Sequence, residues 1–150
     1  MERFNGKVVI VTGGGNGIGL VIANSFAAEG AKVVIADIND SAGKRTADKI
    51  VNSGGTALSI NADVTEEDQV RTLVKKVQNH YGRIDILINN AGISVHKLLV
   101  EMEREAWDRQ IEVQLTGPFL TIKHVGRRMI AQTGGGKIVN ISSAASVMGR

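Results

Sequence analysis

Short runs of β-branched apolar residues alternate along the chain with longer stretches in which apolar residues recur at helical spacing. The predicted strands are Lys7–Thr12, Lys32–Asp37, Ala57–Asn61, Ile84–Asn89 and Lys137–Ser142. These runs are apolar almost throughout rather than at every second position, which is typical of strands covered on both faces of a parallel sheet.

Helical patterns fill the intervals between these strands. The predicted helices are Gly17–Glu29, Ser41–Asn52, Glu66–His80 and Glu103–Thr133. Gly30 directly follows the first of them and Gly82 lies just beyond the third, where a glycine commonly ends a helix. We expect Thr65 to cap the third helix, and Gly117-Pro118 to mark a bend or a restart in the last.

Strand and helix therefore alternate over the whole 150 residues, without a linker or an internal repeat. With right-handed crossovers, this order predicts one α/β domain, residues 1–150, built on a doubly wound parallel sheet. The winding direction should reverse between the first and fourth strands, which gives the strand order 3-2-1-4-5.

The composition removes several classes of function. With no cysteine, the chain has no disulfides, thiolate metal sites or cysteine nucleophile, and it fits a reducing cytoplasm. A net charge of +3 without a long basic run argues against a nucleic-acid partner, and no apolar run is long enough to cross a membrane. The three histidines lack the spacing of metal ligands, so we expect no metal site.

The first strand leads into Thr12-Gly13-Gly14-Gly15-Asn16-Gly17-Ile18-Gly19 and then directly into a helix. In doubly wound sheets, ligands bind beyond the carboxyl ends of the strands. A glycine-rich turn there lets a diphosphate approach backbone amides at a helix N-terminus, so we take Gly13, Asn16, Gly17, Ile18 and Gly19 as candidate phosphate-binding residues. The alternative is a tight turn with a purely structural role.

The second strand ends in Asp37, 20 positions after Gly17. An acidic side chain there can accept hydrogen bonds from both hydroxyls of an adenosine ribose and repel a 2′-phosphate. Asn16 offers no positive charge to such a phosphate, so the pattern favours NAD over NADP. Asp37 could instead cap the next helix, although Asp40 and Ser41 are better placed for that.

The third and fourth strands supply the remaining walls of the site. Asp63 could accept a hydrogen bond from an adenine amino group while Val64 packs on the ring. Alternatively, the charge of Asp63 could serve only to stabilise the N-terminus of the following helix. After the fourth strand, Asn90, Ala91 and Gly92 should lie near the rest of the dinucleotide, whereas Asn89 more simply ties the strand ends together.

Taken together, Thr12–Gly19, Asp37, Asp63-Val64, Asn89–Gly92 and Ile141-Ser142-Ser143 resemble the classical short-chain dehydrogenase/reductase family. The resemblance covers the whole chain and implies a Rossmann-like, NAD(P)-dependent oxidoreductase acting on a small alcohol or carbonyl. It implies that Ser143 orients the carbonyl, that helix 114–131 builds a homo-oligomer, and that further strands follow Arg150.

Two departures accompany this resemblance. Gln114 stands where the family has an Asn that helps hold a water next to its catalytic Lys. The family's Tyr-x-x-x-Lys, whose Lys lowers the Tyr pKa, would begin about a dozen residues after Ser143 and is not within the 150 residues. The chain alone is therefore predicted to be inactive, and a catalytically silent dinucleotide-binding module is the alternative function. A methyltransferase is a weaker alternative, because Asn89-Asn90-Ala91-Gly92 replaces its usual Asn/Asp-Pro-Pro.

Overall fold

The structure is a computed structural model that describes residues 2–143. A single parallel sheet forms its centre, with strands in the order β3-β2-β1-β4-β5. The strands are β1 (Val8–Thr12), β2 (Lys32–Asp37), β3 (Thr56–Asn61), β4 (Ile86–Asn89) and β5 (Lys137–Asn140). The predicted order 3-2-1-4-5 is confirmed, and the reversal of winding falls at β1, between β2 and β4.

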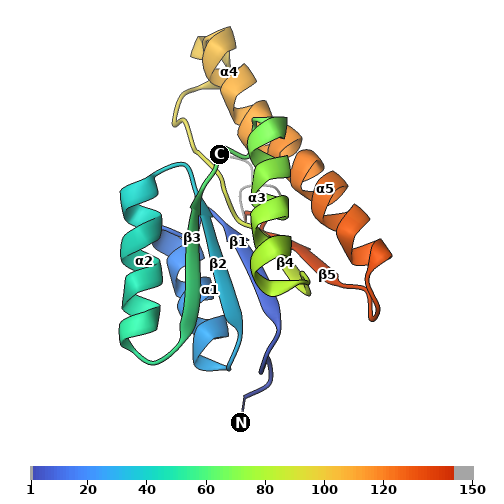
Figure 1. Ribbon diagram of the computed structural model, residues 1–150. Helices are drawn as coiled ribbons and strands as arrows, with labels where there is room; N and C mark the ends of the chain where they lie inside the picture. Colours follow the sequence, from blue (N-terminus) through green and yellow to red (C-terminus); the bar gives the residue numbers. More distant parts are fainter. Residues whose placement is uncertain (1, 144–150) are drawn as a thin grey trace.

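Helices cover both faces of the sheet (Figure 1). They are α1 (Gly17–Ala28), α2 (Asp40–Asn52), α3 (Glu67–Tyr81), α4 (Arg104–Ile111) and α5 (Gly117–Ala131), with a 3₁₀ turn at Leu99–Glu101 and a π-helical turn at Glu112–Thr116. The predicted helical stretch Glu103–Thr133 is thus divided, and α5 begins at Gly117, the position at which the sequence predicts a bend or a restart.

Alternate residues of β1 enter two separate apolar cores. Val8 and Ile10 pack with Leu73 of α3 and Val125 of α5. Val9 and Val11 pack on the other face, in the core to which α1 and α2 contribute. This arrangement explains why the strand is apolar at every position: neither face of its sheet meets water.

Two predicted helix caps are wrong. Asn39, not Asp40 or Ser41, caps α2, and its side chain accepts from the Ala42 N–H at 3.0 Å. The residue before α3 is Glu66, and the Thr65 side chain turns back to Asp63 instead of capping the helix.

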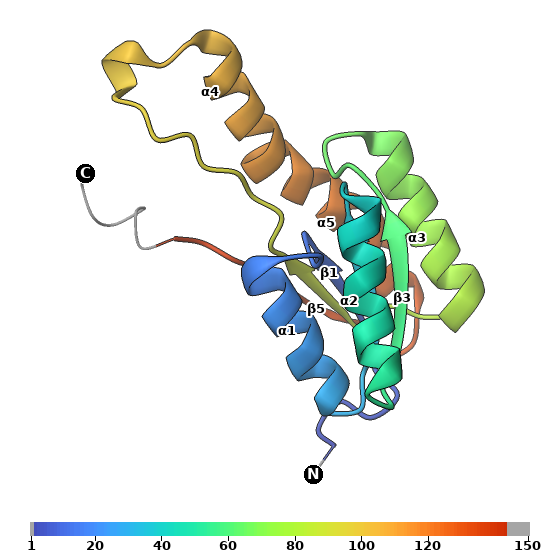
Figure 2. The ribbon, with the colours of Figure 1, turned by 90° about the vertical axis from the view of Figure 1, so that its left-hand side faces the viewer.

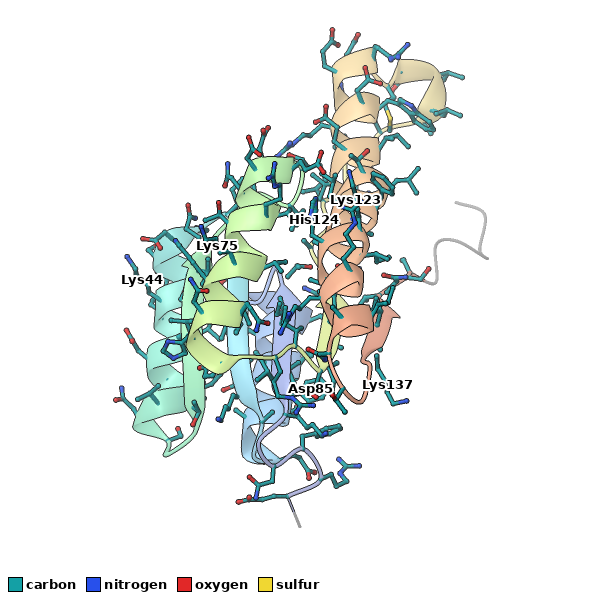
Figure 3. All side chains as sticks on the ribbon, turned by 45° about the vertical axis from the view of Figure 1, so that its right-hand side comes forward. Lys44, Lys75, Asp85, Lys123, His124 and Lys137 are labelled. Carbon is teal, nitrogen blue, oxygen red and sulfur yellow. The ribbon has the colours of Figure 1, made fainter. Side chains whose placement is uncertain are left out.

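One ion cluster joins α3 to α5. Glu67 Oε1 accepts from Lys123 Nζ at 2.7 Å and contacts His124 Nε2 at 2.8 Å, and both residues are labelled on α5 in Figure 3. The hydrogen bonds from Lys123 and His124 lower the pKa of Glu67 to about 2. The pair of helices on this face is therefore held by charge as well as by the apolar core.

All five strands point toward the same edge, and α4 extends beyond that carboxyl edge (Figures 1 and 2). Within residues 2–143, no helix is long and apolar enough to cross a membrane. The exits of the strands therefore meet under α4, where the candidate site residues should be found.

Candidate functional site

A cavity of about 410 Å³ lies at the carboxyl edge of the sheet, where the winding reverses. Its lining comes from the exits of β1 to β4 and from the helical segment above them: Gly13, Asn16, Gly17, Ile18, Ala36, Asp37, Ile38, Ala62, Asp63, Val64, Asn90, Ala91, Gly92, Ile93, Arg109 and Val113. The structure thus brings together every candidate cofactor-binding residue except Gly19.

The glycine-rich turn follows a backbone path that favours glycine. Gly13 and Gly17 have positive φ values of 63° and 52°. A Cβ on Gly13 would lie 2.9 Å from Ala91 Cα, so this glycine also permits the close approach of the β4 exit. Asn16 precedes α1 without a side-chain cap, which leaves the first amides of α1 to attract an anion.

Gly19 has a different position from its neighbours in the turn. It is one of the two buried residues of α1, and a Cβ there would collide with the Gly13 carbonyl and the Asn90 side chain. Gly19 therefore allows α1 to pack closely against the turn, beneath the cavity.

The Asp37 carboxylate is held by two backbone amides. Oδ2 accepts from the Gly15 N–H at 2.8 Å and Oδ1 accepts from the Asn39 N–H at 2.8 Å. Gly15 is fixed in turn because its carbonyl accepts from Thr46 Oγ1 at 3.2 Å. An ionised carboxylate has about four acceptor positions, so Asp37 keeps positions for a ligand in the cavity.

Asp63 is part of a small network at the β3 exit. Its Oδ1 accepts from the Thr65 N–H at 2.9 Å and the Thr65 hydroxyl at 2.7 Å, and its Oδ2 accepts from Arg109 Nη2 at 3.3 Å. Burial raises the pKa of Asp63, but the bonds from Thr65 and Arg109 outweigh burial and leave the pKa below its ordinary value. The cavity therefore contains a fixed carboxylate beside a guanidinium.

Thr12 connects the β1 and β4 exits. Its hydroxyl accepts from the N–H groups of Asn90 and Ala91, both at 3.0 Å. The Asn90 side-chain amide donates to the Thr12 carbonyl at 3.0 Å and to the Gly13 carbonyl at 3.2 Å. The side-chain amide of Asn90 therefore donates its hydrogen bonds within the protein. These bonds hold the glycine-rich turn in position beside the cavity.

Asn89 ties the strand ends together, as the sequence predicts. Its Nδ2 donates to Asn140 Oδ1 at 2.9 Å, and its Oδ1 accepts from the buried Thr121 hydroxyl at 2.7 Å. The side chain therefore joins β4 to both β5 and α5.

A second hollow, of about 780 Å³, adjoins the first and shares Ile18 and Asn90–Gly92 with it. Gln114 and Ser143 both line this hollow. Gln114 lies in the π-helical turn and its Nε2 donates to the Ile93 carbonyl at 3.0 Å. Within this turn the Gly117 N–H bonds to the Glu112 carbonyl, and Pro118 has no N–H with which to continue the α-helical ladder.

The comparisons with known proteins agree with this geometry. A family model described as short chain dehydrogenase matches residues 7–150. The chain belongs to the short-chain dehydrogenase/reductase family. An uncharacterized oxidoreductase of Thermotoga maritima is 44% identical over 147 residues, which are 98% of this chain and 57% of that protein. The galactitol 2-dehydrogenase of Agrobacterium fabrum is 42% identical over 98% of this chain and 56% of its own length.

Solved structures of this dehydrogenase family have the same fold. An NAD⁺-bound xylitol dehydrogenase superposes with a TM-score of 0.94 at 37% identity, over 99% of this chain and 57% of that one. The chain spans between 54% and 60% of the length of the curated relatives it matches.

The tyrosine within the 150 residues of this family member lies far from the two hollows. Tyr81 ends α3 and its ring lies 5.6 Å from Lys32 Nζ, at the residue where β2 begins. It is therefore at the amino edge of the sheet, whereas Ser143 follows the carboxyl end of β5. Burial also raises the pKa of Tyr81.

Sequence reasoning missed Arg109 as a cavity residue. Arg109 and Asp63 are 46 positions apart, and no local motif links a helical arginine to the exit of an earlier strand. Strand order gives no signal for this contact, because β4 and β5 lie on the other side of β1 from β3.

Proposed function

We propose that this chain is the NAD-binding portion of a dehydrogenase/reductase that transfers hydride between NAD(H) and a small alcohol or carbonyl substrate. When bound, the nicotinamide would supply the hydride chemistry, and the residues of this chain would hold the dinucleotide. The names of the galactitol 2-dehydrogenase, of a sorbitol dehydrogenase of Cereibacter sphaeroides that is 39% identical over 147 residues, and of the xylitol dehydrogenase support this substrate class.

The observation that carries the proposal is the position of Asp37. Asp37 is 9% exposed and lines the cavity, and its carboxylate is fixed by the Gly15 and Asn39 amides. A fixed carboxylate at the end of the second strand is suited to accept from the ribose hydroxyls of NAD, and it would repel the 2′-phosphate of NADP. NAD is therefore the proposed cofactor.

Other parts of the cavity fit the remaining groups of NAD. The turn Gly13–Ile18 and the first amides of α1 would receive the diphosphate. Val64 is nearly buried beside Asp63 and would pack on the adenine ring, whose amino group would donate to Asp63. The backbone of Asn90, Ala91 and Gly92 would border the nicotinamide ribose, next to the second hollow.

The second hollow would receive the substrate. In our proposal Ser143 orients the substrate carbonyl there, and Gln114 occupies the position of the family Asn. Gln114 already donates to the Ile93 carbonyl, so it would act through the backbone of this segment. Because Tyr81 lies at the other edge of the sheet, we infer that these 150 residues bind NAD without catalysing hydride transfer by themselves.

The exposed apolar residues of helix 114–131 support self-association. Leu120, Val125 and Met129 are buried in the domain, but Leu115 and Phe119 are 65% and 59% exposed. This helical segment therefore carries two apolar faces. We propose that the second face, which also borders the second hollow through Leu115 and Phe119, joins a further copy of the chain next to the substrate site. The lack of cysteine favours a cytoplasmic setting, and a net charge of only +3 gives no reason to propose a nucleic-acid partner.

The test is a fluorescence titration of the chain with NADH and with NADPH. We expect NADH to bind at least about tenfold more tightly, and Asp37→Ala to remove most of this difference. Asp40→Ala is the matched control, because this exposed carboxylate three residues later pairs with Lys44 outside the cavity. An unchanged preference in Asp37→Ala would refute the role proposed for Asp37.

A further inference from the structure

Arg109 is the one cationic side chain among the described residues that line the first cavity. It reaches the cavity from α4, a helix in which no described residue is buried. Its guanidinium donates from Nη2 to Asp63 Oδ2 at 3.3 Å and from Nη1 to Thr65 Oγ1 at 3.3 Å. The planar guanidinium thus bridges the carboxylate and the hydroxyl that fixes this carboxylate.

The hydrogen bonds around Asp63 determine which acceptor position stays open. Both bonds from Thr65 go to Oδ1, which prevents the carboxylate from rotating. Arg109 occupies one position on Oδ2, and a carboxylate oxygen has two. Oδ2 can therefore accept one more bond, directly beside the N–H groups of Arg109.

A fixed acceptor next to a fixed donor matches one kind of purine edge. Adenine presents an amino donor beside a ring-nitrogen acceptor. Hypoxanthine reverses both groups: it has a carbonyl acceptor in place of the amino donor and an N–H in place of the ring-nitrogen acceptor. In the orientation that adenine adopts, its oxygen would therefore face the negative Oδ2 and its N–H would face the N–H groups of Arg109. We propose that Arg109 is a specificity-determining residue, which together with Asp63 selects adenine over hypoxanthine in the dinucleotide; this inference rests on the proposed function.

If Arg109 only attracted the dinucleotide by its charge, its effect on binding would differ from that of base recognition. A positive charge near the cavity attracts NAD and nicotinamide hypoxanthine dinucleotide equally, because the two carry the same phosphates. A base-reading role changes the ratio of the two dissociation constants, and a general electrostatic or structural role leaves this ratio unchanged. The ratio is therefore the informative quantity.

The experiment is calorimetric titration of the chain with NAD and with nicotinamide hypoxanthine dinucleotide. We expect the unaltered chain to bind NAD about tenfold more tightly than the analogue. Arg109→Ala should reduce this ratio to about twofold, and Arg109→Lys, which keeps a donor, should retain part of it. Arg104→Ala is the matched control and should leave the ratio unchanged, because Arg104 pairs on the same helix with exposed Asp108.

Asp63→Asn provides a second variant that keeps the shape of the side chain. The amide can donate to the hypoxanthine oxygen, so the preference for NAD should narrow or reverse. If Arg109→Ala keeps the original ratio, even with weaker binding of both ligands, the inference is wrong. If the unaltered chain binds both dinucleotides equally, the inference fails while NAD binding stands, and if it binds neither, the proposed function fails as well.

Discussion

The backbone N–H of Gly15 donates a 2.8 Å hydrogen bond to the carboxylate of Asp37, 22 positions further along the chain. This bond joins the glycine-rich turn to the end of β2. The same carboxylate accepts from the Asn39 N–H, at the start of α2. Two walls of the cavity are therefore held in register by one side chain, and such preorganisation lowers the entropic cost of binding.

Replacement of Gly15 by alanine should disturb this contact. A Cβ at Gly15 would lie 2.8 Å from Asp37 Oδ2 and 2.9 Å from Ala42 Cβ. We expect Gly15→Ala to lower the free energy of unfolding by about 1–3 kcal/mol and to weaken NADH binding. Urea unfolding and the NADH titration measure the two effects.

Gly126→Ala is the control for this substitution, because it adds the same methyl group inside α5 with no atom within 4 Å. There we expect a gain of about 0.5–1 kcal/mol, because alanine favours the helix. Equal stability of the two variants would contradict the packing described for Gly15.

Thr12→Val should loosen the junction of the β1 and β4 exits. The buried Thr12 hydroxyl accepts from two amides and donates to the Ile88 carbonyl at 3.4 Å, and valine keeps the volume but makes none of these bonds. We expect a loss of about 1–3 kcal/mol in urea unfolding, with recovery in Thr12→Ser. The exposed Thr72→Val is the control, and a comparably small effect at both positions would show that the hydroxyl of Thr12 is dispensable.

Asp85 should make the stability of the fold depend on acidic pH. Burial raises the pKa of Asp85, but the Arg83 side chain, the Val8 N–H and Lys7 together lower it below its ordinary value of 3.8. Because the folded pKa is the lower one, Asp85 stabilises the fold above about pH 4 and loses this contribution as the pH falls through the folded pKa.

Thermal unfolding between pH 3 and pH 7 tests this expectation. The melting temperature of the unaltered chain should fall below about pH 4. Asp85→Asn should melt lower at pH 7 and show a shallower acid decline, whereas the exposed control Asp48→Asn should follow the unaltered chain. A parallel acid decline in Asp85→Asn would show that other carboxyl groups are responsible. Asp85 is labelled in Figure 3 near the amino edge of the sheet, far from the cavity.

Phe119→Asp should weaken self-association. Phe119 is exposed on the second apolar face of α5, so the charge would be accommodated in a monomer but not in an apolar contact between copies. Sedimentation velocity should show a dimer or larger species for the unaltered chain and a monomer for Phe119→Asp. Val51→Asp, an exposed apolar position on α2, should sediment as the unaltered chain does. A monomer at all concentrations in the unaltered chain would refute the proposed contact.

The fold could be predicted from the sequence because buried parallel strands leave a strong local signal. The five apolar runs give all the strands to within two residues at each end, and connection rules then determine their order. The predicted starts of the first four helices lie within one residue of the observed ones, but their capping residues were harder to predict. Several polar residues near α2 and α3 can cap, and the outcome depends on tertiary contacts. Thr65 bonds to Asp63 instead of to its own helix.

The candidate site could be predicted as far as the strand exits determine it. Gly13 and Asp37 occupy positions that topology alone brings to one edge. Arg109 and Thr12 could not be assigned in this way, because their roles depend on side-chain contacts between segments distant in sequence. The π-helical turn that contains Gln114 could not be predicted from the sequence either, because the nearby Pro118 is its only local signal.

The central claim is that the exits of β1 to β4 form one binding site for NAD. The most direct measurement is a titration of the ¹⁵N-labelled chain with NAD, followed by amide chemical shifts. We predict that the amides of Gly13–Ile18, Asp37, Asp63–Val64 and Asn90–Ile93 shift together along one saturation curve, while those of the exposed residues Val21 and Ser25 on the outer side of α1 stay unchanged. Shifts confined to another surface, or no saturable shift at these four segments, would contradict the account.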